Sequence, residues 1–471
     1  LKFFLQINIL SELTSLTDDK KIHKSRLRSM TMLKTLGRSF AVAAVCAIVL
    51  AANAYSQTCP GSPCCLDPTF GIGGFTVTQV PLGATHTNST RDMVFQSDGK
   101  IVILAYVSDT PTTFRGALVR FTADGSLDAS FGSGGFAYIT WGPGGASKLA
   151  IQTVNGEERF VVAGSECGSG CTRVERYTKW GVLDTTFGTG GATSLNVAWA
   201  PSAVAIQSDQ KILLAGGTNS ILRLKSNGTA DTTYGPNGVS TTNPGMNIRA
   251  LEMLSSGKVL AGGETWNGTS WDFAVGRFNT NGKLDTTFGT KGRTSVDFAG
   301  KLDIVSDLTV DASGKILVSG EAIYVDTTPY PKGFDAVMIR LKSDGKLDTT
   351  FGSGGKTAPL NLGDLQDYFA AVSVQSNGKI VLTGESRLAG NNANANILTA
   401  RYNANGTLDT SYQGTGWNLT EFYGSYDTGI KGTVRLDPTC NCQKFVVAGV
   451  AYTDASNAYA DRYIALLRYS L

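Results

Sequence analysis

The sequence has few of the residues on which most catalytic sites depend. It contains only 2 histidines, and His86 is the one that lies outside the N-terminal segment. No GxSxG, HExxH, phosphate-binding P-loop or helix-opening GxGxxG motif is present, and a serine triad would have to use His86. His86 lies in the polar stretch "GATHTNSTR" and is interpreted as a solvated loop residue. No catalytic residue, cofactor or metal site is predicted.

Charge and long apolar runs are also scarce. Only 17% of the residues are charged. Residues 1–54 hold 8 of the basic and 3 of the acidic residues, which leaves 33 Lys and Arg and 35 Asp and Glu in the remainder. No basic patch favours nucleic acid as a partner, and no apolar run after residue 54 predicts a membrane span.

The N-terminal segment is typical of export. Basic residues Lys34 and Arg38 precede an apolar run over 40–52, and Ala52-Asn53-Ala54 forms an A-x-A cleavage signal. We predict a signal peptide over 30–54, starting at Met30 or Met32, with residues 1–29 as an upstream extension that is not part of the fold. The alternative is an ordinary N-terminal helix. The predicted location is secreted, periplasmic or in the cell envelope.

Glycine, in contrast, is abundant, with 56 residues, and it recurs in one phrase. "LDPTFGIGG", "LDASFGSGG", "LDTTFGTGG", "LDTTFGTKG" and "LDTTFGSGG" are followed or interrupted by the weaker "ADTTYGPNG" and "LDTSYQGTG". Each phrase precedes a short strand, a strand pair around a turn such as "SDGK", and a last strand that leads into the next copy. This defines units over 66–126, 127–182, 183–229, 230–283, 284–346, 347–407 and 408–471, after a Cys-rich segment over 55–65.

Such small four-stranded units hide their sheet faces by packing around a common axis. We therefore predict an all-β fold, a seven-bladed β-propeller of four-stranded antiparallel blades over 66–471. An open β-solenoid is the alternative. The phrase is interpreted as the joint between blades, in which leucine and phenylalanine pack, glycines allow unusual backbone angles and aspartate accepts hydrogen bonds. A calcium loop is the alternative, although each joint offers a single carboxylate.

An arginine recurs in each last strand and needs a partner if it is buried. We expect it to meet the joint aspartate or nearby carbonyl groups; a ring of ligand-binding arginines is the alternative. The recurring residues are Asp67, Asp128, Asp184, Asp231, Asp285, Asp348 and Asp409, with Arg120, Arg176, Arg223, Arg277, Arg340, Arg401 and Arg468.

The pattern "LDxTFGxGG", "DGKIxxxG" and "RFxxDGxLDxTFG" at a spacing of about sixty residues resembles the delta-60 repeat family over residues 66–471. That resemblance implies a secreted or surface β-propeller of bacteria and implies no particular reaction. Ala230 and Gln413 depart from the pattern in the fourth and seventh units.

Export would place the cysteines in an oxidising compartment. Cys167 and Cys171 flank "GSG", which favours a local disulfide. Cys64 or Cys65 is expected to pair with Cys440 or Cys442 and so to close the ring, because the last unit ends in its own last strand. A zinc site is the alternative, but no histidine lies near these cysteines.

Antiparallel order places the uniform turns and joints at one end of the blades and the variable loops at the other. Binding usually uses variable loops on a rigid scaffold. The candidate binding aromatics in and near these loops are Trp141, Trp199, Trp266, Trp271, Tyr324, Tyr330, Tyr368, Tyr423 and Tyr426. They favour a non-enzymatic scaffold for a glycan or an envelope or extracellular protein, although the rings equally suit loop packing.

Two other functions stay open. One is a secreted carbohydrate-active hydrolase or lyase that uses loop carboxylates, such as Asp364 with Asp367 or Glu421 with Asp427. The other is a purely structural role in the envelope.

Overall fold

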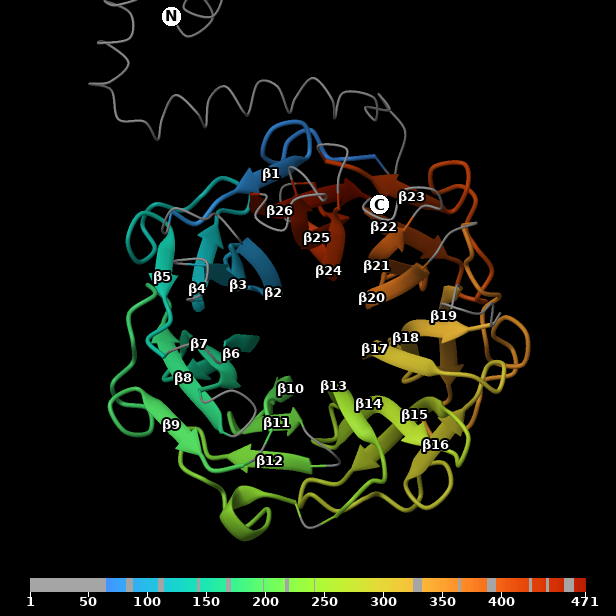
Figure 1. Ribbon diagram of the computed structural model, residues 1–471, viewed down its shortest axis with the longest axis horizontal. Coiled ribbons are helices and arrows are strands. Elements are labelled where there is room, and N and C mark those ends of the chain that lie inside the picture. The colour runs from blue at the N-terminus through green and yellow to red at the C-terminus, as the bar shows by residue number, and fades with distance from the viewer. Residues whose placement is uncertain are drawn as a thin grey trace, which may run out of the picture. The chain divides into compact units, whose positions relative to one another are not determined.

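The computed structural model divides the chain into two compact units, Leu1–Ala54 and Tyr55–Leu471. It describes residues 65–81, 88–108, 114–141, 145–166, 171–197, 199–216, 220–240, 242–324, 333–362, 366–387, 395–422, 426–437, 440–452 and 461–471. The predicted upstream extension, signal peptide and residues 55–64 lie outside these ranges. Within them the second unit is almost entirely β-structure, arranged as a ring of sheets (Figure 1). None of its described helices has the length and apolar character needed to cross a bilayer.

Five groups of four antiparallel strands form blades, each with its innermost strand first. They are β2 (Asn88–Phe95), β3 (Ile101–Ser108), β4 (Phe114–Phe121) and β5 (Phe136–Tyr138); β6 (Ala146–Val154), β7 (Glu157–Ser165), β8 (Thr172–Thr178) and β9 (Ala192–Leu195); β13 (Asn247–Met253), β14 (Val259–Trp266), β15 (Trp271–Phe278) and β16 (Arg293–Val296); β20 (Gln366–Val374), β21 (Ile380–Arg387), β22 (Ala395–Tyr402) and β23 (Trp417–Thr420); and β24 (Thr428–Asp437), β25 (Cys442–Tyr452) and β26 (Arg462–Ser470) with β1 (Phe75–Thr78).

Two further groups have three strands each. They are β10 (Pro201–Ile206), β11 (Ile212–Gly216) and β12 (Ser220–Leu224), and β17 (Asp303–Val310), β18 (Ile316–Ile323) and β19 (Phe334–Leu341). A single parallel pair, Phe334 with Gln366, joins β19 to β20, so that β17 to β23 form one continuous sheet. A 3-10 turn, η3 (Pro236–Gly238), follows the three strands of the first of these groups.

The all-β propeller architecture agrees with the sequence prediction, but seven four-stranded blades is wrong, because only five groups have four antiparallel strands. A proline lies near the missing strand of each shorter group. After β12, Pro236 lies in η3, and only Val239 of the following residues bridges to Leu222. After β19, the stretch around Pro359 forms two isolated bridges, from Lys356 and Leu360, instead of a strand. Pro359 has no backbone N–H and so interrupts a fourth strand.

The sheets are also offset from the sequence units by one strand. The first strand of each unit is the outermost strand of the preceding blade, and β1 therefore pairs with β26 at the far end of the chain. Figure 1 shows β1 beside β26, where the blue and red ends of the ring meet. The expectation that the last unit ends without an exchanged strand is wrong, because hydrogen bonds from β1 close the ring.

The expected disulfide between the two ends of the ring is not formed. Cys440 is bonded to Cys442, with Cα atoms 5.1 Å apart, and Cys65 is a buried thiol. Cys171 is disulfide-bonded, and its predicted partner Cys167 lies outside the described residues. Cys64, the other cysteine considered for closing the ring, also lies outside them. The pairing of β1 with β26 thus closes the ring, as a disulfide was expected to do.

Each recurring arginine donates from Nε to Oδ2 of a joint aspartate, and we call this pair the Arg–Asp clasp. The Nε–Oδ2 distances are 2.9 Å for Arg120–Asp128, 2.8 Å for Arg176–Asp184, 2.9 Å for Arg223–Asp231, 2.7 Å for Arg277–Asp285, 2.8 Å for Arg340–Asp348, 2.6 Å for Arg401–Asp409 and 2.8 Å for Arg468–Asp67. Arg468 and Asp67 come from opposite ends of the chain, so the clasp also closes the ring.

The clasp is connected to the next blade in the ring. In Arg176, Nη1 donates to the backbone oxygen of Ser226, 2.8 Å away, and the guanidinium lies 4.7 Å from the ring centroid of Phe187 in the joint. Phe187 in turn packs under the turn glycine Gly228, where an added Cβ would lie 2.7 Å from the ring. Aspartate, phenylalanine and glycine of the repeated phrases therefore form one continuous contact between neighbouring blades.

The hairpin turns add a second cation to most clasps. Lys258 Nζ lies 2.7 Å from Asp285 Oδ2, and Lys315 Nζ lies 2.9 Å from Asp348 Oδ2. Burial by itself would raise the pKa of Asp348, but hydrogen bonds from Lys315 and Thr350 and the charge of Arg340 outweigh it and hold the pKa well below its usual range. The joint aspartates are therefore ionised partners of buried arginines.

Removal of one clasp carboxylate should destabilise the ring. The variant Asp348→Ala removes the carboxylate that pairs with Arg340, and Arg340 is buried. Truncation of one partner in a buried ion pair lowers the free energy of unfolding by about 3–5 kcal/mol. Asp344→Ala, at an exposed turn position in the same joint, should have a much smaller effect, because interactions of solvent-exposed charges are weak. Denaturant unfolding followed by circular dichroism measures both, and equal effects of the two substitutions would contradict the structural role of the clasp.

The stability difference between wild type and Asp348→Ala should depend on pH. Because the folded-state pKa of Asp348 lies below the unfolded value of about 4, its stabilising contribution is complete above about pH 4 and is lost as the pH falls toward the folded-state pKa. Unfolding curves measured at intervals from pH 7 to pH 2 should therefore converge for the two proteins below about pH 4. A difference that stays constant over the whole series would show that Asp348 acts as a neutral packing group.

Candidate binding site

The two ends of the blades differ in the way the sequence predicts. Gln96 in the β2–β3 turn accepts a hydrogen bond from Arg120 at 3.4 Å, and Lys100 in the same turn lies 3.9 Å from Asp128 in the joint. Hairpin turns and joints therefore lie at one end, which we call the joint end. The other connections, from second to third strands and from outermost strands to the next innermost strands, lie at the opposite end, which we call the variable end.

Three glutamates occupy equivalent places near the variable end, and we call them the glutamate arc. Glu264 on β14, Glu321 on β18 and Glu385 on β21 each follow a glycine and pair with Asn247, Ile304 and Tyr368 near the start of the innermost strands. At the equivalent position, β3 has Tyr106 and β25 has Val450. The fold therefore does not require a carboxylate at this position.

Two members of the arc are held by donors from neighbouring strands. Arg249 Nε donates to Glu264 Oε1 at 2.5 Å, and Gln366 Nε2 donates to Glu321 Oε2 at 3.0 Å. Glu264 Oε2 is buried and has no hydrogen-bond partner among the described residues. Burial raises the pKa of Glu264 and of Glu321, against the attraction of Arg249 in the first case and the Gln366 hydrogen bond in the second.

Glu385 is the centre of a polar network. Its Oε1 accepts from Arg387 Nε at 2.6 Å and from the Tyr426 hydroxyl at 2.8 Å, and its Oε2 accepts from the Tyr368 hydroxyl at 3.2 Å. The Tyr368 hydroxyl also lies 3.1 Å from Thr428 Oγ1. Burial raises the pKa of both tyrosines well above its usual range, and the charge of Glu385 adds to the effect, so both hydroxyls remain donors.

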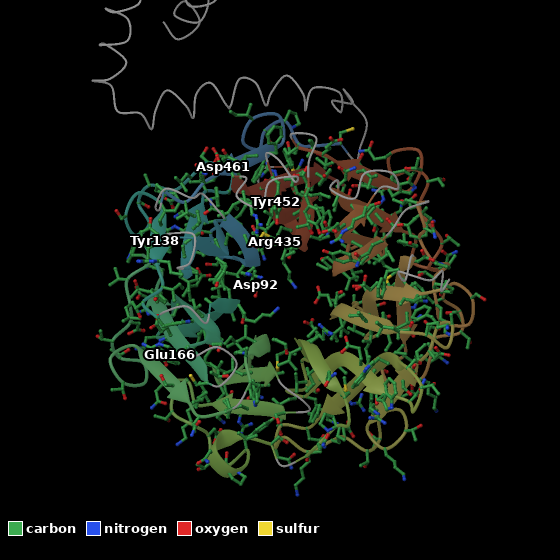
Figure 2. All side chains as sticks on the ribbon, viewed as in Figure 1. Asp92, Tyr138, Glu166, Arg435, Tyr452 and Asp461 are labelled. Atoms are coloured by element: carbon green, nitrogen blue, oxygen red, sulfur yellow. A yellow bond between two sulfur atoms is a disulfide. The ribbon has the colours of Figure 1, made fainter. Side chains whose placement is uncertain are left out.

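The arc opens to solvent at its ends. The side chain of Arg249 is 50% exposed and that of Arg387 is 38% exposed, although the carboxylates that they contact are buried. The ring of Tyr452 lies 5.2 Å from that of Tyr426, centroid to centroid, and the Arg462 guanidinium lies 4.6 Å from the Tyr452 ring. Figure 2 labels Tyr452 in the sheet that contains β24 to β26. Charged donors, hydroxyl groups and an aromatic ring thus surround the buried acids.

The predicted binding aromatics have different surroundings. Trp141 is buried in the core, and Trp199 packs against another core cluster. Trp266 is 53% exposed and lies edge to face with Trp271 at 5.5 Å, and Tyr324 packs against Phe298 at 6.3 Å. Tyr368 and Tyr426 belong to the Glu385 network, while Tyr330 and Tyr423 lie outside the described residues. Of the seven predicted aromatics that the structure describes, Tyr368 and Tyr426 lie at the arc.

Two of the candidate loop carboxylates, Asp367 and Asp427, accept hydrogen bonds from backbone N–H groups. Asp367 Oδ2 accepts from the Leu362 N–H at 2.9 Å. Asp427 Oδ2 accepts from the Phe422 N–H at 2.5 Å, and its Oδ1 accepts from the Tyr452 N–H at 3.2 Å. Asp303 repeats the same contact with the Phe298 N–H at 3.0 Å. These carboxylates hold the connection between an outermost strand and the next innermost strand. Asp364 lies outside the described residues.

The axis of the ring carries a separate set of charges beside the bulges of the innermost strands. Lys431 Nζ lies 3.2 Å from Asp307 Oδ2, and Asp92 Oδ2 accepts from the Leu149 N–H of the neighbouring blade at 2.9 Å. Attraction by Asp307 raises the pKa of Lys431, whereas burial lowers that of Lys148. Figure 2 shows Asp92 beside the centre of the ring. The negative charges of the acids and the positive charges of the lysines on neighbouring innermost strands therefore offset one another.

The joint end exposes apolar side chains that the sequence analysis did not single out. Ile72, Trp180, Val182 and Leu436 are 60%, 51%, 61% and 59% exposed. Trp180 stands where the joint of the preceding unit has Asp124, so the change from "ADG" to "KWG" was the signal available in the sequence. Single exposed apolar residues are common on soluble proteins and do not by themselves define a site.

Comparison with solved structures gives low similarity. Sqt1 from Chaetomium thermophilum is 11% identical with a TM-score of 0.44, covering 82% of this chain and 97% of that one. BamB from Moraxella catarrhalis is 11% identical with a TM-score of 0.34, covering 83% and 98%. A subtype N11 neuraminidase-like protein of A/flat-faced bat/Peru/033/2010 (H18N11) is 12% identical with a TM-score of 0.35, covering 68% and 87%.

No curated protein is significantly similar to the chain. Five segments match the family described as "Domain of unknown function (DUF5122) beta-propeller", at residues 96–131, 207–234, 254–288, 312–351 and 375–412. Each segment runs from a hairpin turn through the last strand to the aromatic residue of the next joint. These five segments are thus similar to a family of β-propeller repeats.

Proposed function

We propose that the protein is a binding scaffold that holds a sugar of a glycan at the glutamate arc. The observation that carries the proposal is the occurrence of Glu264, Glu321 and Glu385 at one position that other blades fill with Tyr106 or Val450. Burial of carboxylates is unfavourable unless they are hydrogen-bonded. Three such residues that the fold does not need are better explained by recognition of a ligand than by stability.

The chemistry of the arc suits a polyhydroxyl ligand. Carboxylates accept hydrogen bonds from hydroxyl groups, arginines donate to them and tyrosine hydroxyls do both. Glu264 Oε2 is a buried acceptor with no partner among the described residues, and a ligand hydroxyl would supply the missing donor. The Tyr452 ring beside Tyr426 offers an amphipathic surface of the kind on which sugar faces stack.

Binding is preferred to hydrolysis because the loop carboxylates that suggested an enzyme, Asp367 and Asp427, accept backbone N–H groups. Export from the cell, in the periplasm or outside it, is part of the proposal. The signal-peptide pattern over 30–54 supports it, and so does the disulfide between Cys440 and Cys442, since structural disulfides persist mainly in oxidising compartments.

The variant Glu385→Gln should weaken glycan binding. Glutamine keeps the size of the side chain but replaces the charged acceptor that Arg387, Tyr426 and Tyr368 share. Loss of a charge-assisted hydrogen-bond network of this kind predicts an affinity at least about tenfold lower. A glycan array identifies the ligand of the full-length protein, and titration calorimetry with that glycan measures wild type and variant.

Glu157→Gln is the matched control, since Glu157 is the exposed first residue of β7 at the joint end and its substitution should leave affinity unchanged. Circular dichroism and thermal unfolding must show that both variants are folded. Glycan affinity that is equal in Glu385→Gln and wild type would reject the arc as the site. Binding only to envelope or extracellular proteins in a parallel panel would reject a glycan as the ligand.

A further inference from the structure

Three aspartates converge where one blade leads into the next group of strands at the variable end. Asp272 lies on β15, Asp297 follows β16 directly, and Asp303 is the first residue of β17. One carboxylate oxygen from each lies within 4.8 Å of those of the other two. Asp272 and Asp303 are buried, at 5% and 0% exposure, whereas Asp297 is exposed. Like charges at this spacing repel one another unless a cation lies between them.

The hydrogen bonds around the cluster leave a buried acceptor without a partner. Asp303 Oδ2 accepts from the Phe298 N–H at 3.0 Å, but Asp303 Oδ1 is buried and has no partner among the described residues. Asp272 Oδ1 accepts from Asn267 Nδ2 at 2.8 Å. A buried carboxylate oxygen without a donor is costly, and this cost points to a group that belongs in the cluster.

Protein cations do not fill this role within the described part of the chain. None of the three carboxylates forms a salt bridge with a described residue. Lys356 donates to the backbone oxygen of Asp297, lies 5.1 Å from the ring of Phe298 and attracts the Asp303 carboxylate. It forms no salt bridge with the three carboxylates, so its ammonium group offsets their charge only in part.

The next two connections provide an internal comparison. Equivalent residues are found by counting from the clasp arginine for the first member and from the bulge of the next innermost strand for the other two. The next two sets are Asp335, Asn361 and Asp367, and Asn396, Glu421 and Asp427. In the first set Asn361 Nδ2 donates to Asp335 Oδ1 at 2.7 Å. Each of these sets contains an amide in place of one carboxylate, and only the set at β16–β17 has three aspartates. The set at β16–β17, which has the most carboxylates, thus lacks the amide donor that the other two sets contain.

We propose that Asp272, Asp297 and Asp303 bind one hard divalent cation, Ca²⁺. All three ligands are oxygens, which favours a hard cation over metals that prefer nitrogen or sulfur. Ca²⁺ accepts ligands at about 2.4 Å, so oxygens on opposite sides of it are about 4.8 Å apart, and the cluster spans no more than that distance. The exposed Asp297 leaves room for water in the remaining coordination positions.

The ion would connect the third and outermost strands of one blade to the innermost strand of the next group. It would lie close to Tyr324, whose pKa burial raises to about 12 with a contribution from Asp303. This site is separate from the glutamate arc and does not depend on the proposed glycan. Its expected effect is a calcium-dependent increase in stability.

Full-length protein freed of metal with a chelator and titrated with CaCl₂ tests the proposal, by calorimetry and by thermal unfolding. Wild type should bind one Ca²⁺ and unfold at a higher temperature in Ca²⁺ than in EDTA. Asp297→Asn gives the cluster the composition of the neighbouring Asp335, Asn361 and Asp367 set. It should lower the Ca²⁺ affinity at least about tenfold, because site charge sets affinity, and should unfold in EDTA at or above the wild-type temperature.

Asp344→Asn is the matched control, the same chemical change at an exposed turn of the joint end, and should leave the response to Ca²⁺ unchanged. A wild-type protein that unfolds at the same temperature in Ca²⁺ and EDTA would overturn the proposal. So would an Asp297→Asn variant with wild-type affinity, or a control that loses as much affinity as Asp297→Asn, since the effect would then come from net charge. A similar response to Mg²⁺ and Ca²⁺ would reject the assignment of the metal.

Discussion

The fold depends on one repeated buried interaction, the Arg–Asp clasp. In most clasps the arginine of the third strand and the aspartate of the following joint are both buried, and a charge in such a place is tolerated only when it is paired and hydrogen-bonded. The pairing fixes the joint against its own sheet, and in Arg176 the same guanidinium reaches the backbone of the next blade. Each clasp therefore couples the local geometry of one group to the position of its neighbour.

Ring closure follows from the same interaction combined with strand exchange. The sheet of β24 to β26 takes its outermost strand from the other end of the chain, and Arg468 finds its aspartate at Asp67. The first and last groups are thus connected by the contacts that connect all the others. A covalent link between the ends is unnecessary, because many hydrogen bonds and a buried ion pair must be lost together before the ring can open.

The sequence was sufficient for much of the architecture, and the remainder has identifiable physical causes. Repetition of the joint phrase predicted the propeller, the contrast between the two ends of the blades and the partner of each arginine. It did not predict at which strand of the repeat each sheet begins, because a periodic sequence contains no marker for that position. As a result, β1 was assigned to the first unit, whereas it pairs with β26 at the other end of the ring. Nor did it predict that two groups would have three strands, one of them where Pro359 lies in the place of the fourth strand.

The candidate site was predicted only in part, since Tyr368 and Tyr426 were named and the acid between them was not. The signal was nevertheless present, as Gly-Glu pairs at 263–264, 320–321 and 384–385 in equivalent strands. Repeats supply an internal standard, because the fold makes the same demand at each equivalent position. A residue that recurs in every group serves the fold, as Asp348 and its equivalents do.

A polar residue that occurs in only some groups, at a buried position, has no such explanation. Glu264 stands where another blade has Tyr106, and Asp297 stands where the next connection has Asn361. In both places the sheets around the residue are held by the same clasps and bulges as elsewhere, so the difference in chemistry does not come from the architecture. Departures from the repeat, more than the exposed aromatic residues, are therefore the observations on which both binding proposals rest.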